Sequence, residues 1–267
     1  MAPEETPEET TCPECGGRGW LIEDDEGRGT ARPCACRRPA EPSRLLEGTG
    51  IPARYRNCRL ENFRVEIAGF EEPLLRARAL ARRYVEEFLT SEGRFREGGL
   101  LFIGPPGVGK THLAAATLRE VVRRYRVQGR FVDFTTLIYQ IRSTFDSGNP
   151  ESKRSVLDPV IGAEILVLDE LGAQKPTAWV SEILYLILNS RYTQRRPTLF
   201  TTNYRLPEGG ESSSPDDRFG ARSDLLSGRI PSMLLSRLYE MAQPVVIDSV
   251  DYRQKVKMYQ HHLAPQE

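Results

Sequence analysis

The sequence has no long hydrophobic run and no excess charge of either sign. None of the apolar stretches in its 267 residues approaches the roughly 18 residues needed to cross a bilayer. The 37 basic residues balance the 37 acidic ones, which argues against a protein that coats nucleic acid but is compatible with a local basic groove. The N-terminal "MAPEETPEET" is acidic and contains proline, unlike a signal peptide. We therefore expect a cytoplasmic protein with no membrane partner.

Cysteine is scarce, and four of the five cysteines lie close to the N-terminus. Cys12 and Cys15 form a C-x2-C pair, and Cys34 and Cys36 form a C-x-C pair after 18 intervening residues. Thiols stay reduced in the cytoplasm, and four thiolates suit tetrahedral zinc, which can fold a segment without a hydrophobic core. The second pair is one residue shorter than a usual zinc knuckle, so reduced or redox-active thiols are the alternative. Cys58 stands apart and is expected to be a small buried apolar residue.

Composition divides the chain into three parts. Residues 1–10 form an acidic tail that is expected to be disordered. Residues 11–48 hold little apolar material and are expected to form the zinc-binding module and a linker. Residues 49–267 alternate apolar strands with amphipathic helices, which predicts one domain with three layers: a parallel five-stranded sheet with helices on both faces. Its expected strands are "LLFI", "RFVDF", "ILVLDE", "TLFTTN" and "PVVID", and residues 207–222 form a polar loop.

A glycine-rich loop follows the first of these strands. It reads "GPPGVGKT" and comprises Gly104, Pro105, Pro106, Gly107, Val108, Gly109, Lys110 and Thr111. The glycines let backbone N–H groups turn toward a phosphate, and the helix that begins at Lys110 adds positive potential there. Lys110 is expected to reach the β- and γ-phosphates, and the Thr111 hydroxyl suits Mg²⁺. A glycine turn without a ligand is the alternative, but every fixed position of the motif is filled in a strand–loop–helix context. The pattern predicts binding of ATP with Mg²⁺.

Two later strands end in polar residues that suit phosphate chemistry. "EILVLDELG" ends in Asp169, which can hold Mg²⁺ through water, and Glu170, which can polarise the attacking water. "TLFTTN" ends in Asn203, which could orient the same water. Solvent-facing acids and a turn-forming asparagine are the alternatives. The spacing of about sixty residues after the phosphate loop favours the catalytic interpretation.

Together these motifs resemble the AAA+ ATPases. The resemblance implies that the Asp-Glu strand and the Asn strand lie beside the phosphate-loop strand. It also implies self-association, in which an arginine of one subunit completes the site of its neighbour. Arg237 in "LLSRLYEM" matches that arginine. Because few residues follow it, we expect no full helical lid.

Several blocks narrow the resemblance to the DnaC/DnaI-type replicative helicase loaders. They are "GIPARYRNCRLENF", "GVGKTHLAAA", "LVLDELGAQKPTAWV", "RRPTLFTTN", "SRLYEM" and the terminal "DYR", spread over residues 49–257. The last block makes Arg253 the match to the family's second nucleotide sensor. The resemblance implies an ATPase that is weak or stimulated by partners. It also implies ATP-controlled binding to single-stranded DNA and delivery of a hexameric DnaB-type helicase onto it.

Two alternatives remain at this point. IstB-type transposition helpers share almost the same ATPase core but usually lack an N-terminal zinc module, so the cysteines favour a loader. A nucleotide-gated protein adaptor without DNA contact is the second alternative. Glu170 argues against it, because a pure binding switch needs no base.

The candidate DNA contacts are less specific. In "TTLIYQIRSTFDSGNPESKRS", Arg142, Lys153 and Arg154 can meet phosphates, with Phe145 or Tyr139 as stacking surfaces. Aromatic residues at helical spacing are more often core, so we expect Tyr139 to pack inward. Eight arginines against two acids between residues 28 and 59 can form a second basic surface or merely a soluble linker. Without a base-reading motif, any DNA binding is expected to be independent of sequence.

Overall fold

The computed structural model describes residues 12–16, 20–25, 28–34, 42–90, 95–145, 150–207 and 225–254. Its strands are β1 (Trp20–Asp25), β2 (Arg28–Pro33), β3 (Gly99–Ile103), β4 (Gly129–Asp133), β5 (Ile165–Asp169), β6 (Thr198–Thr202) and β7 (Ala242–Val246). The helices are α1 (Pro42–Gly48), α2 (Glu71–Glu86), α3 (Lys110–Tyr125), α4 (Phe134–Phe145), α5 (Pro150–Gly162), α6 (Ala178–Thr193) and α7 (Ser232–Met241). The short 3₁₀ turns are η1 (Ala53–Tyr55) and η3 (Leu226–Gly228).

Five of the strands form one parallel sheet in the order β4-β5-β6-β3-β7. β3, β5 and β6 are buried along their whole length, as expected for central strands covered on both faces. The Asn strand β6 lies directly beside β3, whereas the Asp-Glu strand β5 lies one strand further out, on the far side of β6. All three still end at the same edge of the sheet, which brings their terminal residues together.

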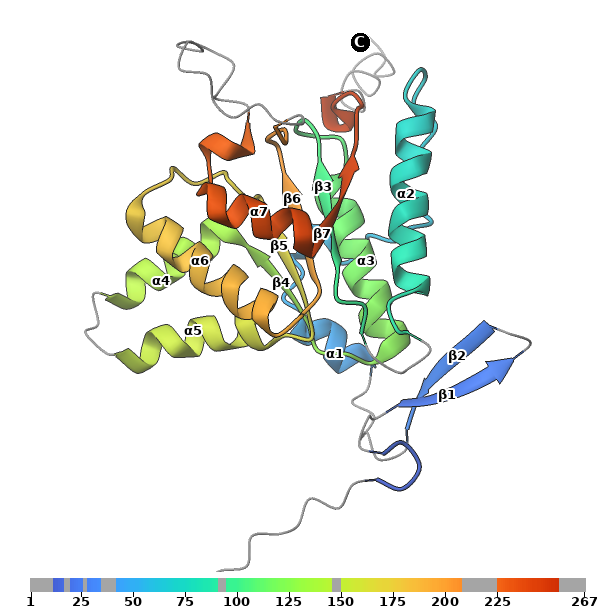
Figure 1. Cartoon of the computed structure of the whole chain (residues 1–267). Helices are drawn as coiled ribbons and strands as arrows, with labels where there is room; N and C mark the ends of the chain where they lie inside the picture. Colours follow the sequence, from blue (N-terminus) through green and yellow to red (C-terminus); the bar gives the residue numbers. More distant parts are fainter. Residues whose placement is uncertain are drawn as a thin grey trace, which may run out of the picture.

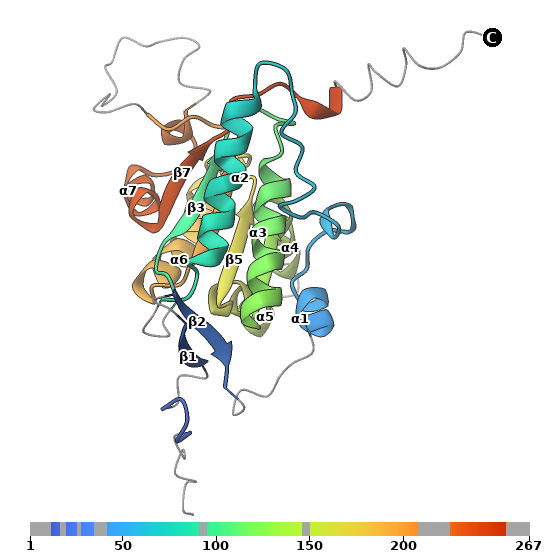
Figure 2. The same ribbon diagram turned by 90° about the vertical axis from the view of Figure 1, so that its right-hand side faces the viewer.

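Helices cover both faces of this sheet (Figures 1 and 2). One hydrophobic cluster joins α2 and α3 to sheet residues such as Leu100 and Phe102. A second joins α4, α5, α6 and α7 to the alternate residues Leu101 and Ile103. The predicted three-layer α/β/α fold with a parallel five-stranded sheet is confirmed. After β7 the described chain continues only through residues 247–254, so the part that the structure describes contains no helical lid.

A close approach of backbones explains the glycine that begins β3. A Cβ atom at Gly99 would lie 1.7 Å from the carbonyl oxygen of Thr198, far inside van der Waals contact. Any other residue would push β3 away from β6. The position of the phosphate loop after β3 therefore depends on this glycine.

A buried arginine joins the helical layer to the sheet. The Arg191 side chain on α6 is fully buried and donates hydrogen bonds to the carbonyl oxygens of Val160, Ile161, Ala163 and Pro197. Three of these carbonyls belong to the end of α5 and the residue after it, where helical carbonyls lack partners within the helix. Arg191 thus satisfies the end of α5 and connects it to the segment before β6.

The N-terminal strands β1 and β2 form a separate antiparallel pair. Cys12, Cys15 and Cys34 flank this pair in sequence, whereas Cys36 lies outside the described residues. Cys58 is buried within the first hydrophobic cluster, as predicted. Among the described residues, no helix is long and apolar enough to span a membrane.

Candidate nucleotide site

The loop between β3 and α3 has the backbone shape that a phosphate-binding loop requires. Gly107 and Gly109 have φ of 84° and 96°, a region that favours glycine, and Gly109 is the N-cap of α3. The Lys110 ammonium lies inside the loop and donates to the carbonyl oxygens of Gly104 (2.8 Å) and Pro105 (2.7 Å). Burial lowers the pKa of Lys110 to about 8. An anionic ligand placed here would offset the cost of burying this cation.

The end of β5 presents one carboxylate to the loop. Asp169 is 5% exposed, and its Oδ1 accepts hydrogen bonds from the hydroxyl groups of Thr111 (3.1 Å) and Thr201 (2.5 Å). Burial raises the pKa of Asp169 to about 6, although the two hydroxyl groups act in the opposite direction. Thr111 and Asp169, predicted from the sequence, therefore meet, and their oxygens are the ligand type that Mg²⁺ prefers.

Glu170 occupies a strained turn after β5. Its φ of 60° is uncommon for a residue other than glycine. Its N–H donates to the hydroxyl oxygen of Thr201 (2.9 Å), and its carbonyl accepts from the N–H of Ala173 (3.1 Å). Thr201 thus holds both Asp169 and the turn that follows. The sequence reasoning assigned no role to Thr201, although a hydroxyl side chain near the end of the apolar segment "TLFTT" was a signal.

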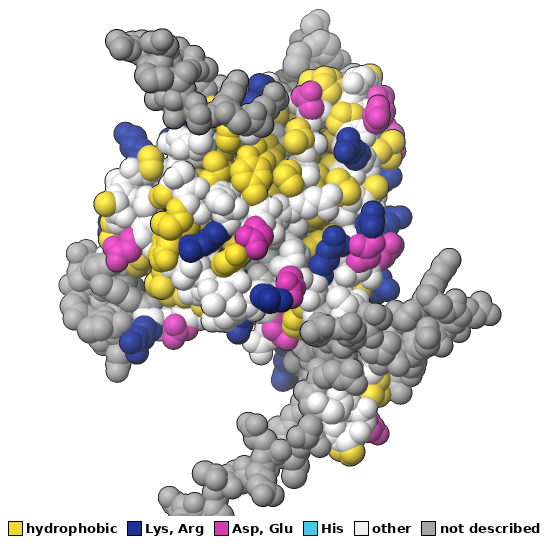
Figure 3. Space-filling view, viewed as in Figure 1, with side chains coloured by type: hydrophobic (Ala, Val, Ile, Leu, Met, Phe, Trp, Pro, Cys, Tyr) yellow, Lys and Arg dark blue, Asp and Glu magenta, His cyan; other side chains and the backbone are white. Residues whose placement is uncertain are grey.

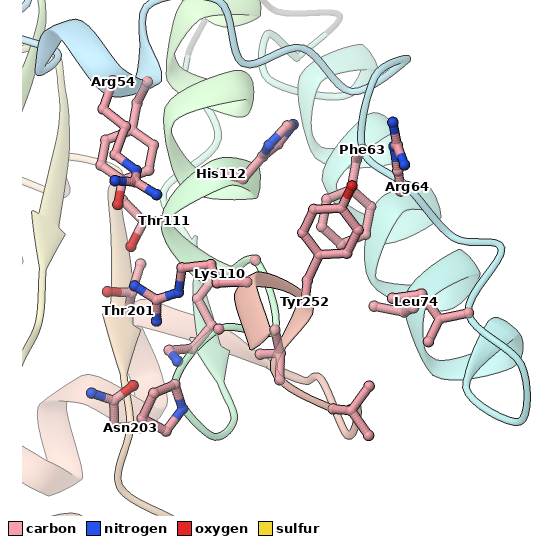
Figure 4. A pocket seen from close by; sticks show the side chains of 18 of the residues that line it. Arg54, Phe63, Arg64, Leu74, Lys110, Thr111, His112, Thr201, Asn203 and Tyr252 are labelled. Atoms are coloured by element: carbon pink, nitrogen blue, oxygen red, sulfur yellow. The ribbon is translucent and has the colours of Figure 1, made fainter. Parts of the chain in front are cut away.

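A cavity of about 340 Å³ lies beside the phosphate-binding loop and the ends of β5 and β6. Glu170, Thr201 and Asn203 line it together with residues 106–112 and Arg253. Figure 4 shows Thr201 and Asn203 on one side of the cavity, Phe63, Arg64 and Tyr252 on the other, and Lys110 between them. The cavity is of the size that binds small ligands.

Part of the cavity wall comes from aromatic and arginine residues to which the sequence reasoning assigned no role. Arg54, Tyr55 and Phe63 belong to the block "GIPARYRNCRLENF", and Tyr252 belongs to "DYR". The Arg64 guanidinium lies over the Tyr252 ring, with 5.6 Å from its carbon to the ring centroid. Aromatic residues beside a phosphate-binding loop offer a surface for a planar base.

The C-terminal segment closes against the phosphate-binding loop. The N–H of Tyr252 donates to the carbonyl oxygen of Gly107 (3.2 Å), and the Asp251 carboxylate fills the space where a Cβ of Gly107 would lie. Oδ1 of Asp251 accepts from the backbone N–H of Arg253 (2.8 Å) and lies 3.6 Å from its Nε. Asp251 therefore holds the backbone of the predicted sensor arginine Arg253 beside the phosphate-binding loop.

Arg237 lies elsewhere. It is on α7 and is not among the described residues that line the cavity of its own chain. Its guanidinium instead packs against two tyrosine rings of α6. Arg237 therefore does not face the nucleotide cavity formed by the described residues of its own chain.

Three of the four predicted metal ligands gather in one place. The sulfur atoms of Cys12, Cys15 and Cys34 all lie within 4.8 Å of one another, and Sγ of Cys12 is 3.7 Å from Sγ of Cys34. Two thiolates bound to tetrahedral zinc at about 2.3 Å are separated by about 3.8 Å, whereas a disulfide is about 2 Å long. The cluster therefore fits zinc, with the Glu14 carboxylate 3.5 Å from Cys34.

The candidate DNA-binding segment is only partly described. The Arg142 and Arg154 side chains are exposed, whereas the side chains of Phe145 and Lys153 lie outside the description. The prediction that Tyr139 packs inward is wrong, because its side chain is 75% exposed. Leu137, Ile138 and Ile141 occupy the inner face of α4 instead. The Arg142 guanidinium lies 5.2 Å from the ring centroid of Trp179.

This arrangement of loop, acidic strand and Asn strand occurs in known proteins. A family model described as "IstB-like ATP binding protein" matches residues 56–259. The chain belongs to this family. Membership supports nucleotide binding and, in general terms, ATPase activity.

The relatives of this chain include proteins named as helicase loaders. The replicative helicase loader DnaC of Escherichia coli K12 is 32% identical over 172 residues, which are 64% of this chain and 65% of that protein. The chain thus spans less than two thirds of the length of this curated relative. The crystal structure of the DnaC helicase loader is 31% identical, covers 73% of this chain and 99% of that chain, and has a TM-score of 0.58.

The structure of DnaI, at 22% identity and a TM-score of 0.54, covers 78% of this chain and 94% of that one and supports the fold alone. Taken together, these matches confirm the resemblance to DnaC-type AAA+ helicase loaders.

Proposed function

We propose that this protein is an ATP-dependent loader that delivers a DnaB-type hexameric replicative helicase onto single-stranded DNA. The observation that carries the proposal is the convergence of Lys110, Thr111 and Asp169 in a chain that is similar to DnaC over 64% of its length. The site can bind ATP and Mg²⁺, and the family likeness indicates what the nucleotide controls. The boundaries of residues 1–10, 11–48 and 49–267 are part of this proposal.

Each residue of the site has one role in ATP hydrolysis. Thr111 would hold Mg²⁺ and Asp169 would support it through water, and the ion would offset charge on the phosphates; Lys110 neutralises the β- and γ-phosphates. Glu170 takes a proton from the attacking water as the water oxygen bonds to the γ-phosphorus. The bond from that phosphorus to the bridging oxygen breaks, and ADP leaves. Asn203 orients the water from the neighbouring strand.

Two arginines report on the γ-phosphate. Arg253 lines the cavity of its own chain, which supports its role as the second sensor. Arg237 lies outside that cavity, which supports action on the nucleotide of an adjacent subunit. ATP therefore couples the state of one site to self-association.

Single-stranded DNA binds along α4 and the start of α5. The exposed Tyr139 ring offers a stacking surface, and the exposed Arg142 and Arg154 meet phosphates, with Lys153 of the same segment as a further contact. Base stacking on an aromatic side chain tolerates any sequence. The surface thus suits a loader, which must act on unwound DNA of varied sequence.

The N-terminal module binds zinc through Cys12, Cys15, Cys34 and Cys36 and grips the helicase. The 3.7 Å separation of two thiols supports zinc. A metal-folded module explains how a segment with little apolar material holds a shape that a partner can recognise.

A loading assay tests the proposal. The substrate is a closed single-stranded DNA circle carrying a tailed oligonucleotide, which a hexameric helicase from the same source cannot thread onto unaided. The protein should stimulate unwinding, Lys110→Ala should abolish the stimulation, and Tyr139→Ala should raise the DNA concentration required by about tenfold. Tyr139→Phe and the exposed control Leu75→Ala should behave as the unsubstituted protein. Absence of stimulation by the unsubstituted protein would contradict the loader assignment.

The family match keeps one other function open. The matching family model is described as an IstB-like ATP binding protein, and IstB-type transposition helpers use duplex DNA and a transposase. ATPase stimulation by duplex DNA but not by single-stranded DNA would favour a transposition helper. Single-stranded stimulation supports the loader.

A further inference from the structure

Arg237 is enclosed by aromatic rings of its own chain. The carbon of its guanidinium lies 5.2 Å from the ring centroid of Tyr185 and 5.7 Å from that of Tyr192. These tyrosines are seven residues apart on α6, so they lie on one face two helical turns apart. Both distances are within the range of cation–π attraction. We call Tyr185 and Tyr192 the aromatic clamp.

The clamp holds Arg237 in a form that is unsuited to binding phosphate. Its Nη1 atom is buried and has no hydrogen-bond partner among the described residues. An arginine that binds phosphate uses its N–H edge in two parallel hydrogen bonds, and a buried Nη1 cannot take part in them. A buried, unpaired N–H group is also unfavourable. The arginine therefore gains hydrogen bonds by leaving the clamp for an anion.

The two rings differ in how firmly they are held. The Tyr192 hydroxyl donates to Oε2 of Glu240 on α7 (2.9 Å), which ties that ring to the helix that carries Arg237. Tyr185 is 37% exposed. Hydrophobic side chains are visible on the face of the molecule seen in Figure 3. Tyr192 is thus the fixed wall of the clamp, and Tyr185 is the wall nearer to solvent.

We infer that Tyr185 and Tyr192 are positioning residues that restrain Arg237 until the nucleotide of an adjacent subunit draws it out. This inference rests on the proposed function, because it requires a shared ATPase site. The aromatic clamp lowers ATP turnover when subunits associate only briefly. When the assembly is stable, Arg237 leaves the clamp. It makes hydrolysis depend more steeply on protein concentration.

ATP turnover measured over a range of protein concentrations tests the inference. Tyr185→Leu removes the ring but keeps apolar volume, and it should raise turnover at low protein concentration by about three- to tenfold, the range that the loss of a cation–π contact allows. Tyr185→Met should give the same rise, while Tyr185→Phe should restore the behaviour of the unsubstituted protein. The neighbouring exposed residue provides the control Leu186→Ala, which should change nothing. In an Arg237→Ala background, Tyr185→Leu should have no effect.

The outcomes separate the inference from the proposed function. If Arg237→Ala lowers turnover but both ringless variants leave it unchanged or reduced, the clamp is refuted and the shared site stands. The clamp is likewise refuted if Tyr185→Leu raises turnover equally with and without Arg237. If Arg237→Ala has no effect at any protein concentration, the shared site fails and the clamp fails with it.

Discussion

Replacing Asp169 by asparagine should stabilise the protein while abolishing its turnover. The carboxyl group is almost fully buried, and burial raises its pKa from 3.8 to about 6. Each pKa unit corresponds to about 1.4 kcal/mol, so the ionised carboxylate costs roughly 3 kcal/mol at neutral pH, as an upper bound. Asparagine keeps an oxygen that accepts from Thr111 and Thr201 but carries no charge.

The pH dependence has a definite sign. Between pH 4 and pH 6 the folded protein keeps a proton on Asp169 that the unfolded chain has lost, so the free energy of unfolding falls as pH rises through this window. Below pH 4 the penalty is absent, and above pH 6 it is fully present. Lys110, whose pKa is about 8, stays protonated in both states throughout the window.

Urea unfolding at pH 4 and pH 7, in protein freed of nucleotide and Mg²⁺, measures this effect. The free energy of unfolding of Asp169→Asn should be higher than that of the unsubstituted protein by about 2–3 kcal/mol at pH 7 and by much less at pH 4. Asp158→Asn, an exposed carboxylate on α5, is the control and should show no such difference. An Asp169→Asn protein that is less stable at pH 7, or that keeps the same dependence on pH, would refute the reasoning. A higher free energy of unfolding in Asp169→Asn would show that the functional carboxylate lowers the stability of the protein.

Three further predictions follow from particular contacts. Gly107→Ala should weaken ATP binding by about tenfold or more, because its Cβ would lie 2.0 Å from the Asp251 carboxylate at a φ of 84°; equilibrium titration checks this, with Gly48→Ala as a silent control. Arg191→Met should lower the free energy of unfolding by about 3 kcal/mol or more, since it leaves buried carbonyl oxygens unpaired, whereas the exposed Arg195→Met should cost less than about 1 kcal/mol in the same urea titration. Metal analysis should find one zinc ion per chain, lost in Cys15→Ser and retained in Cys58→Ala; a zinc-free protein purified without chelators would contradict the metal assignment.

Local patterns predicted the elements and the residues at their ends. The strand–loop–helix at residues 100–111 and the acidic end of β5 could be predicted from the sequence, because the conformation of each depends on residues adjacent in sequence. Residues that contact partners distant in sequence could not be predicted in this way. Thr201 matters because β6 lies between β3 and β5, and no spacing in the sequence states that order.

The same limit applies to the walls of the site. Phe63 and Tyr252 are far apart in sequence and meet the phosphate-binding loop only after the N-terminal block and the C-terminal segment fold against α3. Tyr139 was wrongly predicted to pack inward, because helical spacing alone does not decide which face of α4 meets the sheet. Leu137, Ile138 and Ile141 fill that face. A periodic pattern predicts that a helix forms, but tertiary packing decides which of its faces is buried.

Native mass spectrometry of the zinc-replete protein, mixed with the replicative helicase of the same source, tests the central claim most directly. The account predicts a defined complex of the protein with a helicase hexamer, whose abundance differs between ATP and ADP. Lys110→Ala should remove that difference. No complex in either nucleotide would contradict a helicase loader.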